Sequence, residues 1–270
     1  MATFVLVHPA WFGGWCWSRV APLLRTAGHT VLTPTLTGLG DRAHLLDHGI
    51  DLQTHVEDVV NTLVYEDLEA VVLVGNGSGG MVVTGAADRV PERVAEVVYL
   101  DAFVPEDGEC LFDLLTAEQR AVVESLVRDE GLGWLLPRTA PPPWAEILPR
   151  SWEVTDPGDL AWALPRLRAT PVGHVTRPVR LVNGATGELP RSYVRCTRYP
   201  QPALDRFAQQ ARETPGWRSR ELDGSHLPSI TCPGELADVL LELAGEQGTG
   251  AGAVSRRGAA GTRRGGPGPS

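Results

Sequence analysis

Short apolar runs rich in β-branched residues alternate along most of this chain with segments of helical periodicity. The strand-like runs lie at 3–8, 29–36, 69–75, 95–103, 191–197 and 217–224. The helical segments lie between or after them, at 15–28, 56–66, 78–89, 202–213 and 232–244. Alternating strands and helices form βαβ units, and strands that are buried on both faces of a parallel sheet carry unbroken apolar runs. The sequence therefore predicts an α/β protein with a mostly parallel, doubly wound sheet.

Residues 105–185 interrupt this alternation. They contain apolar helical patches, a proline-rich run and four tryptophans, Trp134, Trp144, Trp152 and Trp162. We expect them to form a helical lid over the carboxyl edge of a core made of residues 1–104 and 186–244. Residues 245–270 are rich in Gly, Ala, Arg and Pro and have almost no large apolar side chains, which predicts a disordered tail.

Composition excludes several classes of function. The net charge of −9 argues against a nucleic-acid binder, and no apolar run reaches the length of a membrane span. The four cysteines form no CxxC pair, so we expect no metal site and reduced thiols in a cytoplasmic protein. GxxxxGK does not occur, and the glycines at 75, 77 and 80 fit GxGxxG only as a lone match, so no nucleotide cofactor is expected. The expected partner is a small-molecule substrate, and the oligomeric state stays open.

The stretch LVGNGSGGMV, at 73–82, has the form of a tight strand-to-helix turn that presents a nucleophile. Such a turn needs small residues two positions before and two positions after the reactive residue. If position 77 is the reactive one, the flanking residues are Gly75 and Gly79, but Gly77 itself has no side chain. If Ser78 is the reactive one, the flanks are Asn76 and Gly80, and Asn76 adds bulk where room is short. We favour the first register.

Several segments together resemble the α/β-hydrolase superfamily, in particular its small esterases and hydroxynitrile lyases. They are LVHPAWFGGWCW, TLTGLGDRAHL, VVLVGNGSGGMV, VVYLDAFVPEDGE and SHLPS, and the resemblance covers residues 1–244. The turn of these proteins commonly reads G-H-S-x-G-G. Laid on this chain, that pattern puts its serine at Gly77 and its variable position at Ser78. The resemblance therefore implies that the nucleophile side chain is absent.

The resemblance also implies the other catalytic positions. His226, in the SHLPS segment that follows the last strand, matches the catalytic histidine. The acid is commonly found after the 191–197 strand, where this chain has Tyr199 instead. A second location in the superfamily falls on Asp101, which could orient His226 or brace its own loop.

Two backbone N–H groups are implied as an oxyanion hole, those of Ala10 and Ser78. Pro9 replaces the usual glycine before Ala10, but Ala10 keeps its N–H. Trp11 and Phe12 follow this loop, so we expect them to line a substrate pocket.

Three hypotheses about function follow. The first is non-hydrolytic acid/base chemistry by His226, as in a cyclase, isomerase, dehydratase or lyase, on an apolar carbonyl compound. The Arg-, Ala- and Gly-rich composition is typical of high-GC actinobacteria, where such proteins often accompany polyketide pathways, so a polyketide-type intermediate is one expected substrate. The second is an esterase or lactonase that uses Ser78 or a water activated by His226. The third is a non-catalytic protein that binds a ligand. We favour the first because Gly77 cannot form an acyl-enzyme.

A pair of substitutions separates these hypotheses. His226→Ala should abolish turnover if His226 moves the proton, whereas Ser78→Ala should keep most of it. Intact-protein mass spectrometry after treatment with a fluorophosphonate gives a second readout. A stoichiometric adduct that Ser78→Ala removes would show that Ser78 is a nucleophile and that the favoured register is wrong.

Overall fold

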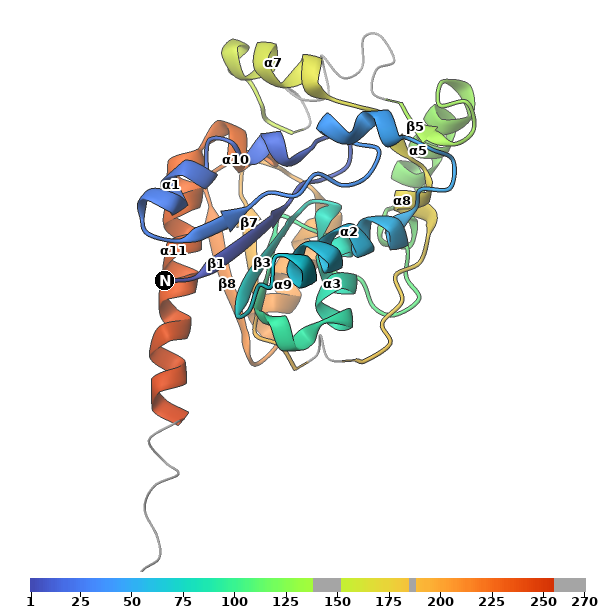
Figure 1. Ribbon diagram of the computed structural model, residues 1–270. Helices are drawn as coiled ribbons and strands as arrows, with labels where there is room; N and C mark the ends of the chain where they lie inside the picture. Colours follow the sequence, from blue (N-terminus) through green and yellow to red (C-terminus); the bar gives the residue numbers. More distant parts are fainter. Residues whose placement is uncertain (138–151, 185–187, 255–270) are drawn as a thin grey trace, which may run out of the picture.

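The computed structural model describes residues 1–137, 152–184 and 188–254, and its centre is a six-stranded sheet (Figure 1). The strands are β1 (Thr3–Val7), β2 (Thr30–Leu32), β3 (Val71–Asn76), β4 (Val94–Leu100), β7 (Arg191–Cys196) and β8 (Trp217–Leu222). They lie in the order β2-β1-β3-β4-β7-β8, and every neighbouring pair is parallel. The predicted fold class is therefore confirmed. Because parallel strands all end at one edge, the loops that follow β1, β3, β4, β7 and β8 meet there.

Helices cover both faces of this sheet (Figure 1). One face carries α1 (Ala21–Thr26) and α11 (Pro233–Val254), and the other carries α2 (Leu52–Tyr65), α3 (Gly79–Arg89) and α9 (Pro202–Glu213). Short helical turns complete the core: η1 (Gly14–Trp17), η2 (Gly40–Leu45), η3 (Pro91–Arg93) and α10 (Pro228–Thr231). The helix expected at 15–28 is divided into η1 and α1, because Pro22 favours a new helix start at its own position. Helix α11 continues past Gly245, where the sequence predicted a tail, to Val254, and residues 255–270 lie outside the described ranges.

The sequence of α2 shows how local chemistry sets one of these elements. The side chain of Asp51 accepts hydrogen bonds from the first turn, and Thr54 bonds back to the Asp51 N–H, which forms a capping box. Such a cap contributes about 1 kcal/mol. Leu52, Val56, Val59 and Leu63 recur at helical spacing and are fully buried, and α2 packs against α3 and α8.

The segment expected to form a lid contains short elements. They are α4 (Leu111–Leu114), α5 (Ala117–Asp129), β5 (Leu135–Leu136), α7 (Pro157–Ala163), η4 (Leu164–Arg166), β6 (Thr170–Pro171) and α8 (Gly173–Thr176). Strands β5 and β6 form a small antiparallel pair, and α7 lies above the carboxyl edge of the sheet in Figure 1. Trp144 and the prolines at 141–143 fall outside the described residues. Residues 177–184 form neither helix nor strand.

Some negative findings bear on function. No helix in the described ranges is long and apolar enough to cross a membrane. Within the same ranges, no group of three or more His, Cys, Asp or Glu side chains is arranged to hold a metal ion. The cysteines, Cys16, Cys110, Cys196 and Cys232, are all free thiols.

The turn between β3 and α3 is tightly packed against neighbouring backbone. A Cβ on Gly75 would lie 2.7 Å from the carbonyl oxygen of Gly79, and one on Gly80 would lie 2.1 Å from that of Phe103. Both neighbours are backbone atoms, which cannot move aside as a flexible side chain can. Glycine is therefore required on both sides of Gly77 for the turn to form.

Gly80→Ala should destabilise the protein by about 3 kcal/mol, because its methyl group overlaps the backbone of the loop after β4. The free energy of unfolding in urea measures this effect. Gly234→Ala, on α11, is the matched control, since a Cβ there meets no atom within 4 Å. It should change stability by less than about 0.5 kcal/mol, and equal losses in the two variants would contradict the packing argument.

Candidate active site

Gly77 occupies the turn at the carboxyl end of β3 in a left-handed conformation, with φ of 55°. Its N–H donates to the carbonyl of Leu100 and its carbonyl accepts from the N–H of Phe103, so the loop after β4 holds the turn in place. A Cβ at this position would point at His226, 3.0 Å from Nε2, and would lie 3.3 Å from Cβ of Pro9. Position 77 is thus the point of the turn that faces the histidine, and it carries no side chain.

His226 and Asp101 form a buried pair at the same edge. Nδ1 of His226 lies 2.7 Å from Oδ2 of Asp101. A carboxylate only accepts hydrogen bonds, so Nδ1 carries the proton in this contact. In the neutral ring Nε2 is then unprotonated and can accept a proton on the side that faces Gly77.

Asp101 is held in a strained backbone conformation, with φ of 45° for a fully buried, non-glycine residue. Its Oδ1 accepts hydrogen bonds from Nη1 of Arg195 and from the N–H of Cys196, at 2.5 and 3.1 Å. Arg195 also pairs with Asp205 on α9. These contacts fix one oxygen of Asp101 and leave the other for His226. Backbone strain of this kind concentrates at functional sites.

The loop that carries His226 is fixed on two sides. Nδ2 of Asn76, at the end of β3, donates to the carbonyl of His226, and the His226 N–H donates to the carbonyl of Trp152. The ring itself packs against Tyr199 and Trp152, with centroid separations of 4.5 and 5.4 Å. The turn, the lid segment and the loop after β7 therefore all contribute to the orientation of one imidazole.

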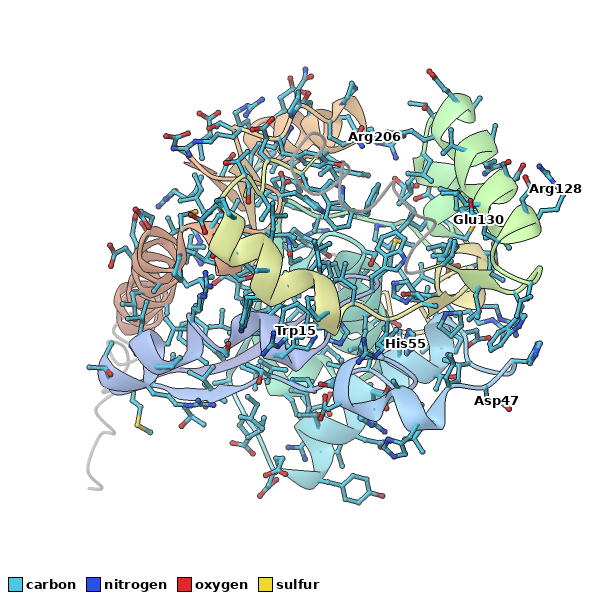
Figure 2. All side chains as sticks on the ribbon, turned by 90° about the horizontal axis from the view of Figure 1, so that it is seen from above. Trp15, Asp47, His55, Arg128, Glu130 and Arg206 are labelled. Atoms are coloured by element: carbon cyan, nitrogen blue, oxygen red, sulfur yellow. The ribbon has the colours of Figure 1, made fainter. Side chains whose placement is uncertain are left out.

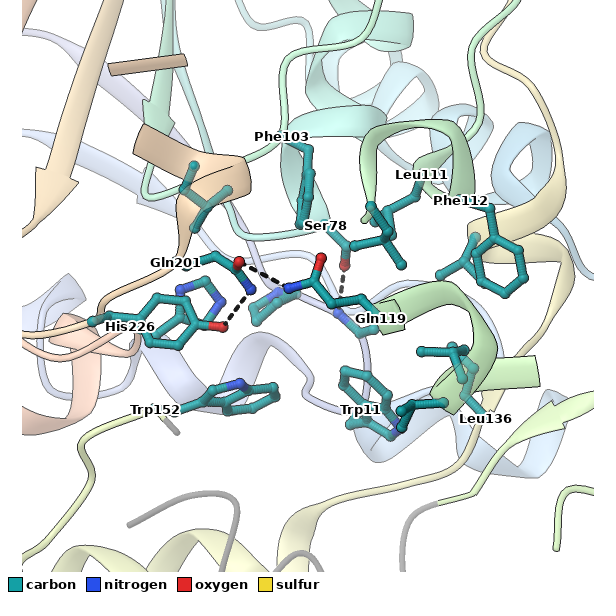
Figure 3. Close-up of a pocket in the computed structure, with 18 of the residues that line it drawn as sticks. Trp11, Ser78, Phe103, Leu111, Phe112, Gln119, Leu136, Trp152, Gln201 and His226 are labelled. Carbon is teal, nitrogen blue, oxygen red and sulfur yellow. Dashed lines mark hydrogen bonds between the residues drawn. The ribbon is translucent and has the colours of Figure 1, made fainter. Parts of the chain in front are cut away.

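The two N–H groups expected to form an oxyanion hole, those of Ala10 and Ser78, differ in their hydrogen bonds. The N–H of Ala10 donates to Oγ of Ser78 at 2.8 Å (Figure 3). The first N–H groups of a helix have no partner within it, and in the described part of the chain the Ser78 N–H, at the start of α3, makes no hydrogen bond. One expected donor is open and the other is engaged. Ser78 Oγ makes its bonds to Ala10 and to His174, at 2.8 and 3.0 Å, and not to His226.

A cavity of about 410 Å³ lies over these groups, between the sheet edge and the lid. Ala10, Ser78 and His226 form its floor, and its walls are mainly apolar side chains of the lid and the neighbouring loops, including Phe103, Leu111, Phe112, Leu136 and Trp152 (Figure 3). Trp11 lines the cavity as expected, also with a positive φ, of 69°. Phe12 does not, since it is fully buried and packs against Trp15 and Trp152.

Polar side chains cross one side of this apolar cavity. Nε2 of Gln119, on α5, donates to Oε1 of Gln201 at 2.8 Å, and Nε2 of Gln201 donates to the hydroxyl of Tyr199 at 3.4 Å (Figure 3). Gln119 belongs to the lid, whereas Gln201 is the N-cap of α9. The row thus joins the lid to the core beside His226.

Three buried histidines lie behind the floor of the cavity, and sequence reasoning did not identify them. Nε2 of His174, on α8, lies 3.0 Å from Ser78 Oγ, and its Nδ1 lies 2.8 Å from Nδ1 of His55, on α2. Figure 2 shows His55 toward the interior, whereas Asp47 lies at the rim. Burial lowers the pKa of His55, lowers that of His174 well below its usual value, and lowers that of His8 to about 4. A histidine in a helical pattern is commonly a core residue, so the sequence carried no sign of this contact.

Comparison with known proteins agrees with the fold. Residues 4–239 match a family described as Alpha/beta hydrolase family. A carbendazim hydrolyzing esterase of Nocardioides sp. is 37% identical over 251 residues, which are 90% of this chain and all of that protein. An extracellular α/β-hydrolase from a Paenibacillus species shares the fold, with a TM-score of 0.78 and 24% identity over 90% of this chain and 98% of that one. Tomato methylketone synthase I complexed with β-ketoheptanoate also shares it, with a TM-score of 0.70 and 20% identity over 91% of this chain and 98% of that one.

The buried histidines predict how stability depends on pH. A histidine whose pKa is lower in the folded than in the unfolded state binds fewer protons when folded, so the free energy of unfolding falls as pH decreases. For His8 the loss spans pH 6.5 to about 4, at about 1.4 kcal/mol per pH unit. His8→Asn should therefore lower stability at pH 7 but reduce the slope over this range by about that amount. Urea unfolding at several pH values measures it, with the exposed His44→Asn as a control that keeps the native slope.

Proposed function

Since the chain belongs to the alpha/beta hydrolase family, we propose that it is an enzyme that hydrolyses an apolar ester with water activated by His226, without an acyl-enzyme. One observation carries this proposal. Nε2 of His226, a residue that lines the cavity, faces Gly77 and makes no hydrogen bond within the described residues, and because Gly77 has no side chain, a water molecule in the cavity can bind to this nitrogen.

The proposed reaction proceeds in two proton transfers. Water bound to Nε2 of His226 gives a proton to that nitrogen as its oxygen forms a bond to the ester carbonyl carbon. Asp101 stabilises the imidazolium through the contact at Nδ1. The tetrahedral intermediate then collapses, the bond to the alkoxide breaks, and His226 returns the proton to that leaving group. The products are an acid and an alcohol, and the protein ends in its starting state.

The negative oxygen of the intermediate needs donors. The N–H of Ser78 is available, and the positive end of α3 adds to its effect. The N–H of Ala10 can contribute only if it leaves or shares the hydroxyl of Ser78. Apolar walls favour an aromatic or branched substrate of a size that fits about 410 Å³.

Hydrolysis stands first because the relative at 37% identity is named as an esterase and aligns over its full length. This revises the order given by the sequence alone, in which non-hydrolytic chemistry stood first. The nature of the ester remains open in this proposal, since the cavity has few polar groups to select one.

A second candidate is the non-hydrolytic one, a cyclase, isomerase, dehydratase or lyase on a carbonyl compound such as a polyketide-type intermediate. The observation that favours it is the same open position at Gly77, which can admit a substrate C–H group toward His226 as well as a water. Proton abstraction next to a carbonyl needs a base and an oxyanion donor and no nucleophile.

Two other possibilities are supported less well. Ser78 as a nucleophile lacks a hydrogen bond to the carboxylate-backed His226. A purely ligand-binding protein would not require the strained Asp101 or its contact with His226.

Gly77→Ala tests the open position. Its methyl group would lie 3.0 Å from Nε2 of His226 and crowd the water bound there, so kcat for aryl esters should fall about 100-fold, while backbone strain lowers stability by about 1–2 kcal/mol. Gly77→Ser should instead gain covalent labelling by a fluorophosphonate, which the native protein should not show. A native kcat in the folded Gly77→Ala protein would rule out a reaction at this position.

The two candidate reactions are separated by deuterium exchange. Ketones that cannot be hydrolysed are incubated with the protein in D₂O, and exchange next to the carbonyl is followed by NMR. Exchange that His226→Ala abolishes, together with no ester turnover, would favour the non-hydrolytic reaction. Ester turnover without exchange would favour hydrolysis.

A further inference from the structure

The hydroxyl of Ser78 is held from two sides at the floor of the cavity. Its oxygen accepts a hydrogen bond from the N–H of Ala10 at 2.8 Å and lies 3.0 Å from Nε2 of His174. The residue lines the cavity and is 7% exposed. Which way the hydroxyl proton points decides what the oxygen can offer a ligand.

The histidines behind Ser78 determine that direction. Nε2 of His55 lies 2.9 Å from the carbonyl oxygen of Thr37, which can only accept, so Nε2 carries a proton. Burial lowers the pKa of both His55 and His174, so each ring is neutral and has a single N–H. Nδ1 of His55 is therefore unprotonated, and the 2.8 Å contact between the two Nδ1 atoms requires the proton on His174. This leaves Nε2 of His174 as an acceptor.

Ser78 must then donate its proton to His174. The order of donors runs in one direction, from Ser78 through His174 and His55 to the carbonyl of Thr37, and no neutral alternative satisfies all three contacts. With its proton directed inward and one lone pair engaged by Ala10, Ser78 Oγ retains one lone pair. Toward a ligand it can act only as an acceptor.

In nucleophilic serine–histidine pairs the serine also donates its proton to the histidine. His174 differs because it lacks the partner that makes such a histidine a strong base. The second group on His174 is a neutral imidazole and not a carboxylate, and both His55 and His8 oppose its protonation. His226, in contrast, is backed by Asp101. A base of low pKa that is fully buried gains little by taking the serine proton.

We propose that Ser78 is a specificity-determining residue that accepts a hydrogen bond from an N–H or O–H group of the substrate next to the reacting carbonyl. This inference rests on the proposed function only in taking the cavity as the substrate site. Secondary amides and hydroxyl-bearing carbonyl compounds meet the requirement. Their fully substituted counterparts present no donor and leave the Ser78 lone pair unpaired.

The test uses two unreactive ligands that differ in one donor, N-methyl-2-phenylacetamide and N,N-dimethyl-2-phenylacetamide. Trp11 and Trp152 line the cavity, so their fluorescence reports binding without turnover. The native protein should bind the secondary amide about 3- to 10-fold more tightly. Ser78→Ala should remove the difference, and Ser78→Thr, which keeps a hydroxyl, should retain it.

His174→Gln gives an independent readout that does not remove the hydroxyl. Its amide can donate to Ser78 Oγ and release the hydroxyl proton toward the cavity, so the preference for the secondary amide should fall or reverse. Equal affinities of the two amides in the native protein would overturn the proposal. So would a difference that persists in Ser78→Ala, or a stoichiometric fluorophosphonate adduct on Ser78 of the native protein.

The same binding experiment on His226→Ala separates this proposal from the proposed function. Discrimination between the amides that survives in a protein without turnover supports the role of Ser78 alone. Turnover of esters by a native protein that does not discriminate would support the proposed function and contradict the role of Ser78.

Discussion

Close packing of backbone against backbone at the turn between β3 and α3 is the constraint on which the site depends. Gly79 and Gly80 have no room for a Cβ against the backbone after β1 and β4, and Gly75 has none against Gly79, so glycine at these positions brings the turn against both loops. Gly77 is then held at the one point that faces Nε2 of His226, with a φ of 55°. The residue of this turn that faces His226 therefore carries no side chain, and a backbone conformation of this kind persists only where the surroundings enforce it.

Two hydrogen-bonded systems with different chemical character meet at this turn. His226 is backed by the carboxylate of Asp101, which is fixed in turn by Arg195. His174 is backed by a neutral imidazole and finally by a backbone carbonyl. The carboxylate beside His226 stabilises a protonated ring, which suits proton transfer. The neutral partner of His174 disfavours a protonated ring, which suits a hydrogen bond whose direction is fixed.

Much of the fold followed from the sequence because burial on both faces imposes a simple pattern on parallel strands. The boundaries were less accurate near Pro22 and Gly245, where helix starts and stops depend on neighbouring packing. For the site, chain order and resemblance indicated His226. They left open whether Asp101 orients His226 or braces its own loop. The contacts of His174, Arg195 and Gln201 could not be predicted, because each joins segments that are distant in sequence and carry no motif.

The hydrogen bond between Gln119 and Gln201 has a consequence for access to the cavity. It joins α5 to the N-terminus of α9 by neutral side chains, and both residues line the cavity. A neutral bond of this type contributes about 1 kcal/mol in net terms, because water replaces it when it breaks. This contact between α5 and α9 is therefore weak, and an apolar molecule that displaces water from the aromatic walls of the cavity gains more free energy than separating the two side chains costs.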